Sequence, residues 1–410
     1  PQLSCPNPPR LTADIAALLA AVNLQAAQGT SSQHSTDSGG SAGIGVSIAF
    51  GGSQNGIAFT AGASGSRGHA DGDSIEWTNT HVAAGDTLTI QSGGDTNVKG
   101  AVVSGKQVVA DIGGNLNVES LQNFDHFDSK QQSAGVSVSV CVPPICYGGS
   151  SVSANVNQQK MRSDYASAGE QSGIQAGDGG FQINVKGNTD LKGGVIASSD
   201  KAIQDAANSL TTATLTYSDI QNHASYDASQ VGISGGYGGS IGKDQKGTAT
   251  NVNPVSGTTL PSAGGLSMAP PVALHASGDA SSTTRSGISG GAIEITDGDK
   301  EQQLTGKSAA EAVASINRDT SNTGGTLAPI FDKDKVQAGF DITSQFINQV
   351  GTFVDNRVKE ADAAQKALDA EKAKPTDQQD AAKIAQLTQT LQDNATWESG
   401  GTGRRVLTAL

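Results

Sequence analysis

The chain has 410 residues, with 26 Lys and Arg against 39 Asp and Glu, so its formal net charge is −13. It contains 53 glycines, only 4% aromatic residues and 35% hydrophobic residues, below the usual hydrophobic share of about 45–50%. The acidic charge argues against nucleic acid as the main partner, because phosphate binding needs clustered Lys and Arg. The composition also excludes a thick globular core, so we expect an extended architecture with a thin aliphatic core.

The N-terminal part, residues 1–40, predicts a linker with one short helix. We place this helix over Thr12 to Ala27. The longest apolar run, Ile15 to Val22, has eight residues, well short of the ~18–20 that cross a membrane. The chain starts at Pro1 with neither an initiator Met nor a signal peptide, so we expect it to be a piece of a longer protein.

Residues 41–229 contain repeats on two scales. GGDTNV at 93–98 returns as GGNLNV at 113–118, an offset of 20, and GDTNVKGAVVS at 94–104 returns as GNTDLKGGVIAS at 187–198, an offset of 93. The short units alternate apolar and polar residues between glycine corners, which is typical of strands that bury one face. Stacked rungs of about twenty residues indicate a parallel β-helix.

The fold class that we predict is mainly β: a right-handed parallel β-helix with protruding β-hairpins, followed by a C-terminal α-helical hairpin. The core of the rungs should be a narrow aliphatic column. We expect the following residues to form it: Leu88, Ile90, Val98, Val109, Ile112, Leu116, Val118, Ile183, Val185 and Leu191.

Alternating, glycine-rich runs follow two Ser-Ala-Gly triplets, and they predict hairpins that stand off the rungs. The second run ends in CVPPIC, so Cys141 and Cys146 frame a short turn. We favour a disulfide between them over two buried thiols, because a fixed Pro-Pro turn brings the thiols near each other and the chain looks secreted. The redox state of Cys5 stays open.

The composition changes twice toward the C-terminus. Residues 230–285 read as a third hairpin followed by a Gly-, Ser- and Pro-rich linker, which we begin at 243, and 286–306 as a degenerate last β unit. Residues 307–410 read as a helical segment, with an antiparallel hairpin of helices over 336–373 and 377–395. Thr376 and Gln379 fit a capping box at the start of the second helix.

No motif predicts catalysis or a cofactor. The serine-hydrolase pattern GxSxG occurs four times, which reflects composition, since no site offers the strand–turn–helix context that the nucleophile needs. Gly306-Lys307-Ser308 lacks the first glycine of a phosphate loop, because Glu301 stands in its place. The six histidines are scattered without the spacing of metal ligands. We therefore predict no catalytic, cofactor-binding or metal-binding residues and no enzyme activity.

The repeats resemble a known family. Residues 77–122 (WTNTHVAAGDTLTIQSGGDTNVKG…), 163–198 and 208–229 are similar to the haemagglutinin repeats of filamentous-haemagglutinin-type exoproteins. The strings NRDTSN at 317–322 and PIFDKDKVQ at 329–337 resemble the segment that follows these repeats in contact-dependent growth inhibition exoproteins. WESGGTGRRVLTAL at 397–410 resembles the approach to their pretoxin region.

This resemblance implies a function. Such proteins leave the cell through a dedicated outer-membrane transporter of a two-partner secretion system, and they are displayed on the bacterial surface. The region that this chain matches is expected to assist toxin transfer to a neighbouring cell, with the target's outer membrane or a surface receptor as partner. We expect any toxin to lie C-terminal to this chain. The alternative is the stalk of a filamentous adhesin that binds host or bacterial surfaces. A surface-attached enzyme is the weakest of the three hypotheses.

Overall fold

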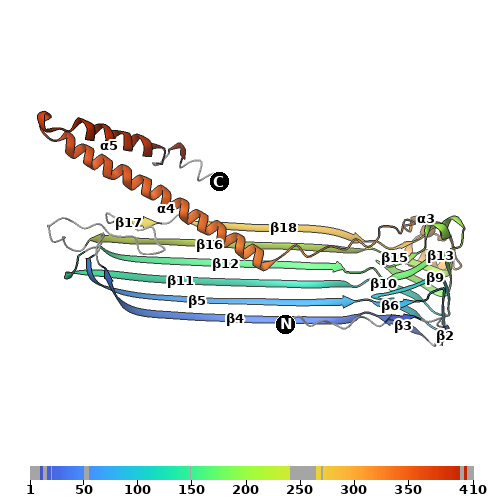
Figure 1. The fold of residues 1–410 in the computed structure, drawn as a ribbon. Coiled ribbons are helices and arrows are strands. Elements are labelled where there is room, and N and C mark those ends of the chain that lie inside the picture. The colour runs from blue at the N-terminus through green and yellow to red at the C-terminus, as the bar shows by residue number, and fades with distance from the viewer. Residues whose placement is uncertain are drawn as a thin grey trace.

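We analysed a computed structural model of the chain. It combines a parallel sheet at one end, a long antiparallel sheet of hairpins, and C-terminal helices that cross the second sheet (Figure 1). The structure describes residues 10–12, 16–19, 21–49, 55–147, 149–240, 265–268, 271–397 and 401–403.

The first sheet, which we call the parallel stack, has 13 strands in the described part of the chain. Its strands stack in three parallel columns, because successive passes of the chain lie directly on one another. The first column contains β1 (Arg10–Thr12), β6 (Thr80–Ala83), the start of β9 (Ala101–Ile112), the start of β13 (Gly173–Lys192), β14 (Val195–Ala197) and β19 (Gly287–Ile288). The second contains β2 (Ala16–Leu19), β7 (Thr87–Ser92), the end of β9, the middle of β13, the start of β15 (Ser209–Ser218) and β20 (Ala292–Ile295). The third contains β3 (Val22–Gln25), β8 (Thr96–Lys99), β10 (Leu116–Glu119), the end of β13 and the end of β15.

Residues that are equivalent in the sequence repeats lie in the same column of this stack. Val98 of β8 lies beside Val118 of β10, an offset of 20, and the same column continues through Leu191 of β13. The side chain of Asn117 donates to Asn97 at 2.7 Å, and that of Asn97 donates to Asn23 at 2.6 Å. The predicted stacking of parallel strands at an offset of about twenty residues is therefore confirmed.

Nine of the ten expected core residues are buried in one hydrophobic cluster: Leu88, Ile90, Val98, Ile112, Leu116, Val118, Ile183, Val185 and Leu191. Val109 is the exception and is only partly buried. Alternation along β9 directs its neighbours, Val108 and Ala110, into the cluster, and Val109 points the other way. The expectation for Val109 was thus wrong by one position.

The glycine corners let neighbouring passes approach closely. A Cβ atom added at Gly113 would collide with the carbonyl group of Gly93, one pass below. The backbone nitrogen of Gly114 donates to the carbonyl of Gly94 at 3.0 Å at the same corner. The repeated Gly-Gly pair is therefore required by contact between backbones rather than by flexibility alone.

The expected N-terminal helix was wrong. The described residues of this part form three short strands, and β3 pairs in parallel with β8. Val22 and Leu24 alternate with exposed neighbours and pack against the stack's core. Pairing with an existing column outweighs the helix propensity of the preceding alanines and leucines, which is a weak preference.

The second sheet, which we call the hairpin sheet, is antiparallel. Its three hairpins leave the stack after every second pass: β4 (Ala27–Ala49) with β5 (Asn55–Thr78), β11 (Gln122–Tyr147) with β12 (Gly149–Ala168), and β16 (Ile220–Ser240) with β18 (Val272–Thr284). Neighbouring hairpins also pair with each other, so that β4 and β18 lie at opposite edges (Figure 1). The predicted hairpins are confirmed.

The end of the expected linker is a strand. Residues 272–284 form β18, which pairs with β16 over Ile220–Gly232. β17 (Gly265–Met268) pairs with the distal part of β16. Leu274 and Ala276 alternate with residues of the other face and contact a hydrophobic cluster on one face of the sheet. Burial of these side chains favours an extended strand in this segment. The rest of the linker prediction, 243–264 and 269–270, lies outside the described residues.

Short helices flank and close the C-terminal end of the stack: α1 (Asp200–Gln204), α2 (Gly298–Thr305) and α3 (Ala309–Ser315). β19 and β20 form the expected last β unit just before α2. The buried carboxylate of Glu301 in α2 accepts a hydrogen bond from the backbone nitrogen of Leu215 at 2.7 Å. Ile316 completes the hydrophobic core.

The expected helical hairpin is confirmed as α4 (Lys333–Lys372) and α5 (Ala381–Asn394), which run back along each other (Figure 1). The capping box was wrong. Thr376 begins a short 3-10 turn, η1 (Thr376–Gln378), and the side chain of Asp380 caps α5 by accepting from Ala382 and Lys383. A second 3-10 turn, η2 (Ala395–Trp397), follows α5.

Candidate functional surface

The hairpin sheet has two chemically different faces. Residues that are opposite in an antiparallel register share a face, and Val138 lies opposite Val152, while Val156 lies opposite Ile233. This face, at the end of the hairpins far from the stack, carries exposed apolar side chains, and we call it the apolar tip face. It is formed by Ile44, Val46, Ile48, Ile57, Phe59, Val136, Val138, Val152, Val156, Val231, Ile233 and Tyr237.

The reverse side of the same strands carries small polar residues. Ser137 and Ser153 are hydrogen-bonded to each other at 2.7 Å, and Asn155, next to Val156, is exposed there. No second layer covers the apolar tip face among the described residues. Large exposed apolar patches on proteins commonly mark interaction sites, so the apolar tip face is the candidate interaction surface of the described residues.

Nearer the stack, the face that carries the apolar tips bears a row of histidine–carboxylate pairs across the hairpin sheet. The pairs are His34–Asp71, His69–Asp128, His126–Asp164, His223–Asp164 and His275–Asp227. The sixth histidine, His81, pairs with Glu170. The spacing of the histidines along the sequence does not reveal this row, because it does not show the cross-strand registers that align them.

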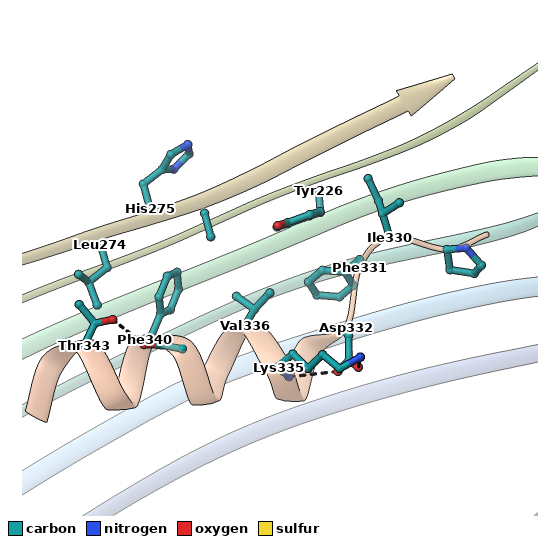
Figure 2. A pocket seen from close by; sticks show the side chains of 13 residues that line it. Tyr226, Leu274, His275, Ile330, Phe331, Asp332, Lys335, Val336, Phe340 and Thr343 are labelled. Atoms are coloured by element: carbon teal, nitrogen blue, oxygen red, sulfur yellow. Dashed lines mark hydrogen bonds and ion pairs between the residues drawn. The ribbon is translucent and has the colours of Figure 1, made fainter. Parts of the chain in front are cut away.

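The opposite face of this middle section is covered. The loop before α4 and the first turns of α4 lie on it, and Phe331, Val336 and Phe340 face the strands (Figure 2). Met161 and Ala228 are buried beneath them. A cavity of about 660 Å³ remains between this segment and β18, lined in part by Leu274, Ile330 and Thr343.

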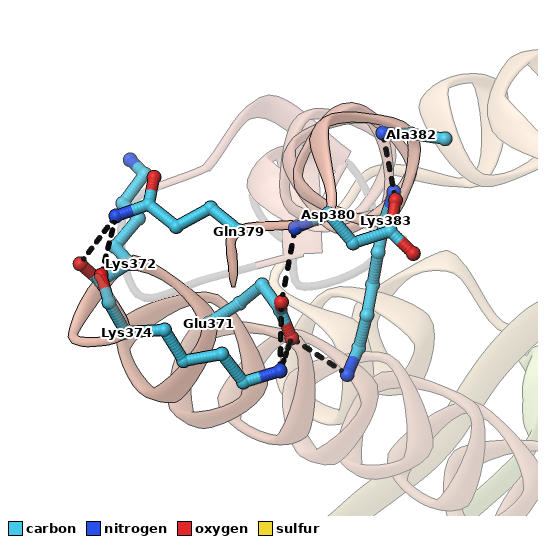
Figure 3. A network of polar contacts seen from close by, with 7 residues as sticks. All are labelled: Glu371, Lys372, Lys374, Gln379, Asp380, Ala382 and Lys383. Carbon is cyan, nitrogen blue, oxygen red and sulfur yellow. Dashed lines mark hydrogen bonds and ion pairs between the residues drawn. The ribbon is translucent and has the colours of Figure 1, made fainter. Parts of the chain in front are cut away.

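A buried carboxylate joins the two long helices. Glu371 of α4 binds the ammonium groups of Lys374 and Lys383 at 2.8 and 2.9 Å and accepts from the backbone nitrogen of Asp380 (Figure 3). These hydrogen bonds, led by that of Lys374, lower the pKa of Glu371 to about 2. The network fixes the turn between α4 and α5. No motif in the sequence predicts this network.

A second carboxylate binds across passes of the stack. Glu119 contacts Lys99 at 3.0 Å and Lys192 at 3.1 Å, each on a neighbouring strand. Burial alone would raise the pKa of Glu119, but the hydrogen bonds from the two lysines outweigh it and lower the pKa. These charges follow the same stacking register as the Asn97–Asn117 contact.

Cys141 is buried at the tip of β11 and is disulfide-bonded. The backbone of Cys146 lies on the same strand, beyond a register irregularity in the pairing with β5. The side chain of Cys146 is outside the described ones, as is Cys5, so the pairing of Cys141 with Cys146 stays a prediction.

The described residues contain no group of three or more His, Cys, Asp or Glu that could hold a metal ion. The four GxSxG serines lie apart: Ser41 on β4, Ser234 and Ser240 on β16, and Ser289 beside β19. Within the described ranges, no helix is long and apolar enough to span a membrane.

The sequence of the chain is similar to that of known proteins with the same kind of repeat. The family described as "Hemagglutinin repeat" covers residues 13–136, which span the first strands of the stack, the first hairpin and part of the second. No solved structure matches the chain. The passes and hairpin strands within residues 13–136 are thus similar to the haemagglutinin repeat.

Three relatives specify the type. The chain is 37% identical to "Toxin CdiA" of Escherichia coli over 80% of its length and 10% of the relative's. It is 37% identical to "Deoxyribonuclease CdiA" of Yersinia pseudotuberculosis over 78% of its length and 26% of the relative's. It is 34% identical to "tRNA nuclease CdiA" of Escherichia coli strain NC101 over 92% of its length and 11% of the relative's. The chain is therefore a filamentous-haemagglutinin-like region of the CdiA type, and it spans about a tenth to a quarter of the length of these relatives.

Proposed function

We propose that this chain is a structural and delivery segment of a contact-dependent growth inhibition exoprotein. In this proposal the parallel stack is a right-handed β-helix that acts as a rigid scaffold, and the hairpin sheet is its working surface. The observation that carries the proposal is the apolar tip face, which a purely structural stalk in water would not need. The similarity to toxin CdiA proteins supports the toxin-related setting.

The proposed partners belong to the parent protein. An outer-membrane two-partner-secretion transporter would export it, and the outer membrane or a surface receptor of a neighbouring cell would meet the displayed segment. The chain itself would have no enzyme activity, so nuclease activity such as the relatives' names record would come from another part of the parent protein. Nucleic acid is not a proposed partner, given the net charge of −13.

The proposal is tested with two single substitutions in the parent protein. Val156→Asp puts a charge on the apolar tip face, where the side chain is 58% exposed. Asn155→Asp puts the same charge on the reverse face, one residue away. We expect Val156→Asp to abolish inhibition of neighbouring cells in co-culture and Asn155→Asp to leave it intact. Surface display, measured by protease accessibility on whole cells, should be equal in both.

The same pair of variants separates the adhesin alternative, which the haemagglutinin-repeat match favours. If Val156→Asp removes adhesion to cells or surfaces while inhibition survives, the stalk of an adhesin is the better description. If both variants behave like the unchanged protein in both assays, the apolar tip face has no role in delivery and the proposal fails.

A further inference from the structure

The outer edge of β4 is the longest free strand edge in the described part of the molecule. β4 has 23 residues and pairs with β5 along its whole length without a register shift. None of the described strands pairs with its other side (Figure 1). Proteins protect such edges with Lys, Pro or a bulge, because the unpaired N–H and C=O groups otherwise bind another strand. β4 contains no Lys, no Pro and no bulge.

The apolar tip face ends abruptly at this edge. Ile44 is 92% exposed, and Val46 is 60% exposed. Inside the sheet, apolar residues of this face lie opposite one another: Val46 opposite Phe59, and Val138 opposite Val152. A strand that adds to β4 should therefore present apolar residues on the same face.

We propose that the strand that pairs with the tip of this edge, residues 43–49, is β4 of a second copy of the chain. Antiparallel pairing in which Val46 lies opposite itself places Ile44 opposite Ile48 of the other copy and continues the apolar rows of the sheet. The overlap covers only residues 43–49, which carry no charge, so no like charges oppose each other. The remainder of each molecule then extends away from the seam in opposite directions.

β18, at the opposite edge of the sheet, does not offer the same complement. β18 carries its large apolar residue, Leu274, on the opposite face, where Leu274 contacts the cluster beneath α4. Pairing of β4 with itself is also isologous, so it closes with two copies and does not grow into a fibre. This inference concerns self-association and does not depend on the proposed role in toxin delivery.

Cysteine cross-linking of the 410-residue chain tests the seam and its register. Val46→Cys should give a disulfide-linked dimer under mild oxidation, because residue 46 faces itself across the seam. Thr36→Cys lies on the same face of β4, outside the overlap, and should give no more dimer than the unchanged chain. Cross-linking through residue 36 instead of residue 46 would overturn the proposed register.

Light scattering after size exclusion tests the choice of edge over face. The unchanged chain should be dimeric, Val46→Lys monomeric, and Val156→Lys still dimeric, since Val156 is about equally exposed on the same face but lies on an internal strand. A cooperative thermal unfolding transition in each of the two variants would show that both are folded. A monomeric unchanged chain at every concentration would overturn the proposal. Loss of the dimer in both variants would overturn it too, since the apolar tip faces would then be stacking on each other.

Discussion

The strands of the parallel stack and of the hairpin sheet both alternate apolar and polar residues. The apolar residues are buried in the stack, but they are exposed at the tip of the hairpin sheet. In the stack, Leu116 and Val118 of the sequence LNVE are completely or almost completely buried. In the hairpin sheet, Val136 and Val138 of the sequence GVSVSV remain exposed. The difference is the second layer: the stack folds three columns around one interior, whereas the tip of the hairpin sheet is a single layer.

This comparison shows that alternation reports a two-faced strand and not the burial of either face. The stack stabilises the molecule by removing aliphatic side chains from water. The hairpin sheet leaves the apolar side chains of its tip exposed, and its strands are held by backbone pairing along lengths of 20 residues and more. In the proposed function, stability and interaction are therefore assigned to different sheets of one chain.

The largest expected effect comes from placing a charge in each sheet. Leu116→Asp buries an unpaired carboxylate in the dry interior of the stack and should lower the free energy of unfolding by about 4 kcal/mol. Val156→Asp places the same group on the exposed apolar tip face and should change it by no more than about 0.5 kcal/mol. Urea unfolding followed by circular dichroism measures both. Equal losses would mean that the tip face is covered and that the comparison is wrong.

A smaller effect is expected from adding one methyl group in each sheet. In Gly113→Ala the new Cβ meets the backbone of Gly93, which cannot move aside freely, so we expect a loss of about 1–3 kcal/mol. In Gly43→Ala the new Cβ meets nothing within 4 Å, and the stiffer unfolded chain should give a gain of about 0.5 kcal/mol. Thermal unfolding measures the difference. Tolerance of Gly113→Ala would argue against close contact between passes.

The disulfide should contribute still less to the molecule as a whole. If Cys141 pairs with Cys146, the closed loop is short, and the entropic effect is at most about 2 kcal/mol and confined to the tip of the second hairpin. Peptide mapping without reduction should show the two cysteines in one cross-linked peptide. Hydrogen exchange after reduction should then increase at the tip and stay unchanged in the stack. A peptide that links Cys141 to Cys5 would refute the pairing.

Acid should act most strongly on the turn between the two long helices. The pKa of Glu371 is about 2 in the fold against an ordinary value of 4.5. A carboxylate whose pKa is lower in the folded state stabilises the fold above its ordinary pKa and loses that effect as the pH falls toward the lower value. The protection of backbone amides around residues 371–383 against hydrogen exchange, relative to the intrinsic exchange rate at each pH, should therefore fall between pH 4.5 and about 2.

Two variants separate this network from general acid effects. Glu371→Gln should show fast exchange in the α4–α5 turn already at neutral pH. Glu360→Gln, which removes an exposed partner of Arg357, should behave like the unchanged protein. Identical pH profiles in Glu371→Gln and in the unchanged chain would show that the Glu371 network does not hold the turn.

Local patterns in the sequence by themselves determined much of this protein. The offset of 20 is the register between β8 and β10, the alternating runs are the hairpins, and the helical periods of the C-terminal part are α4 and α5. Each of these features depends on neighbours in sequence or on exact repetition, which a sequence displays directly. The aliphatic interior was recognised for the same reason, apart from the shift by one residue at Val109.

Tertiary structure alone decided the rest. Val22 to Gln25 form a strand because they pair with a column of the stack. Leu274 lies in a strand because its segment pairs with β16 and its side chain packs against the cluster beneath α4. The histidine row and the Glu371 network join residues from separate strands or helices, so no spacing along the chain reveals them. The exposure of the apolar tip face depends on whether a second layer exists, and alternation is the same in either case.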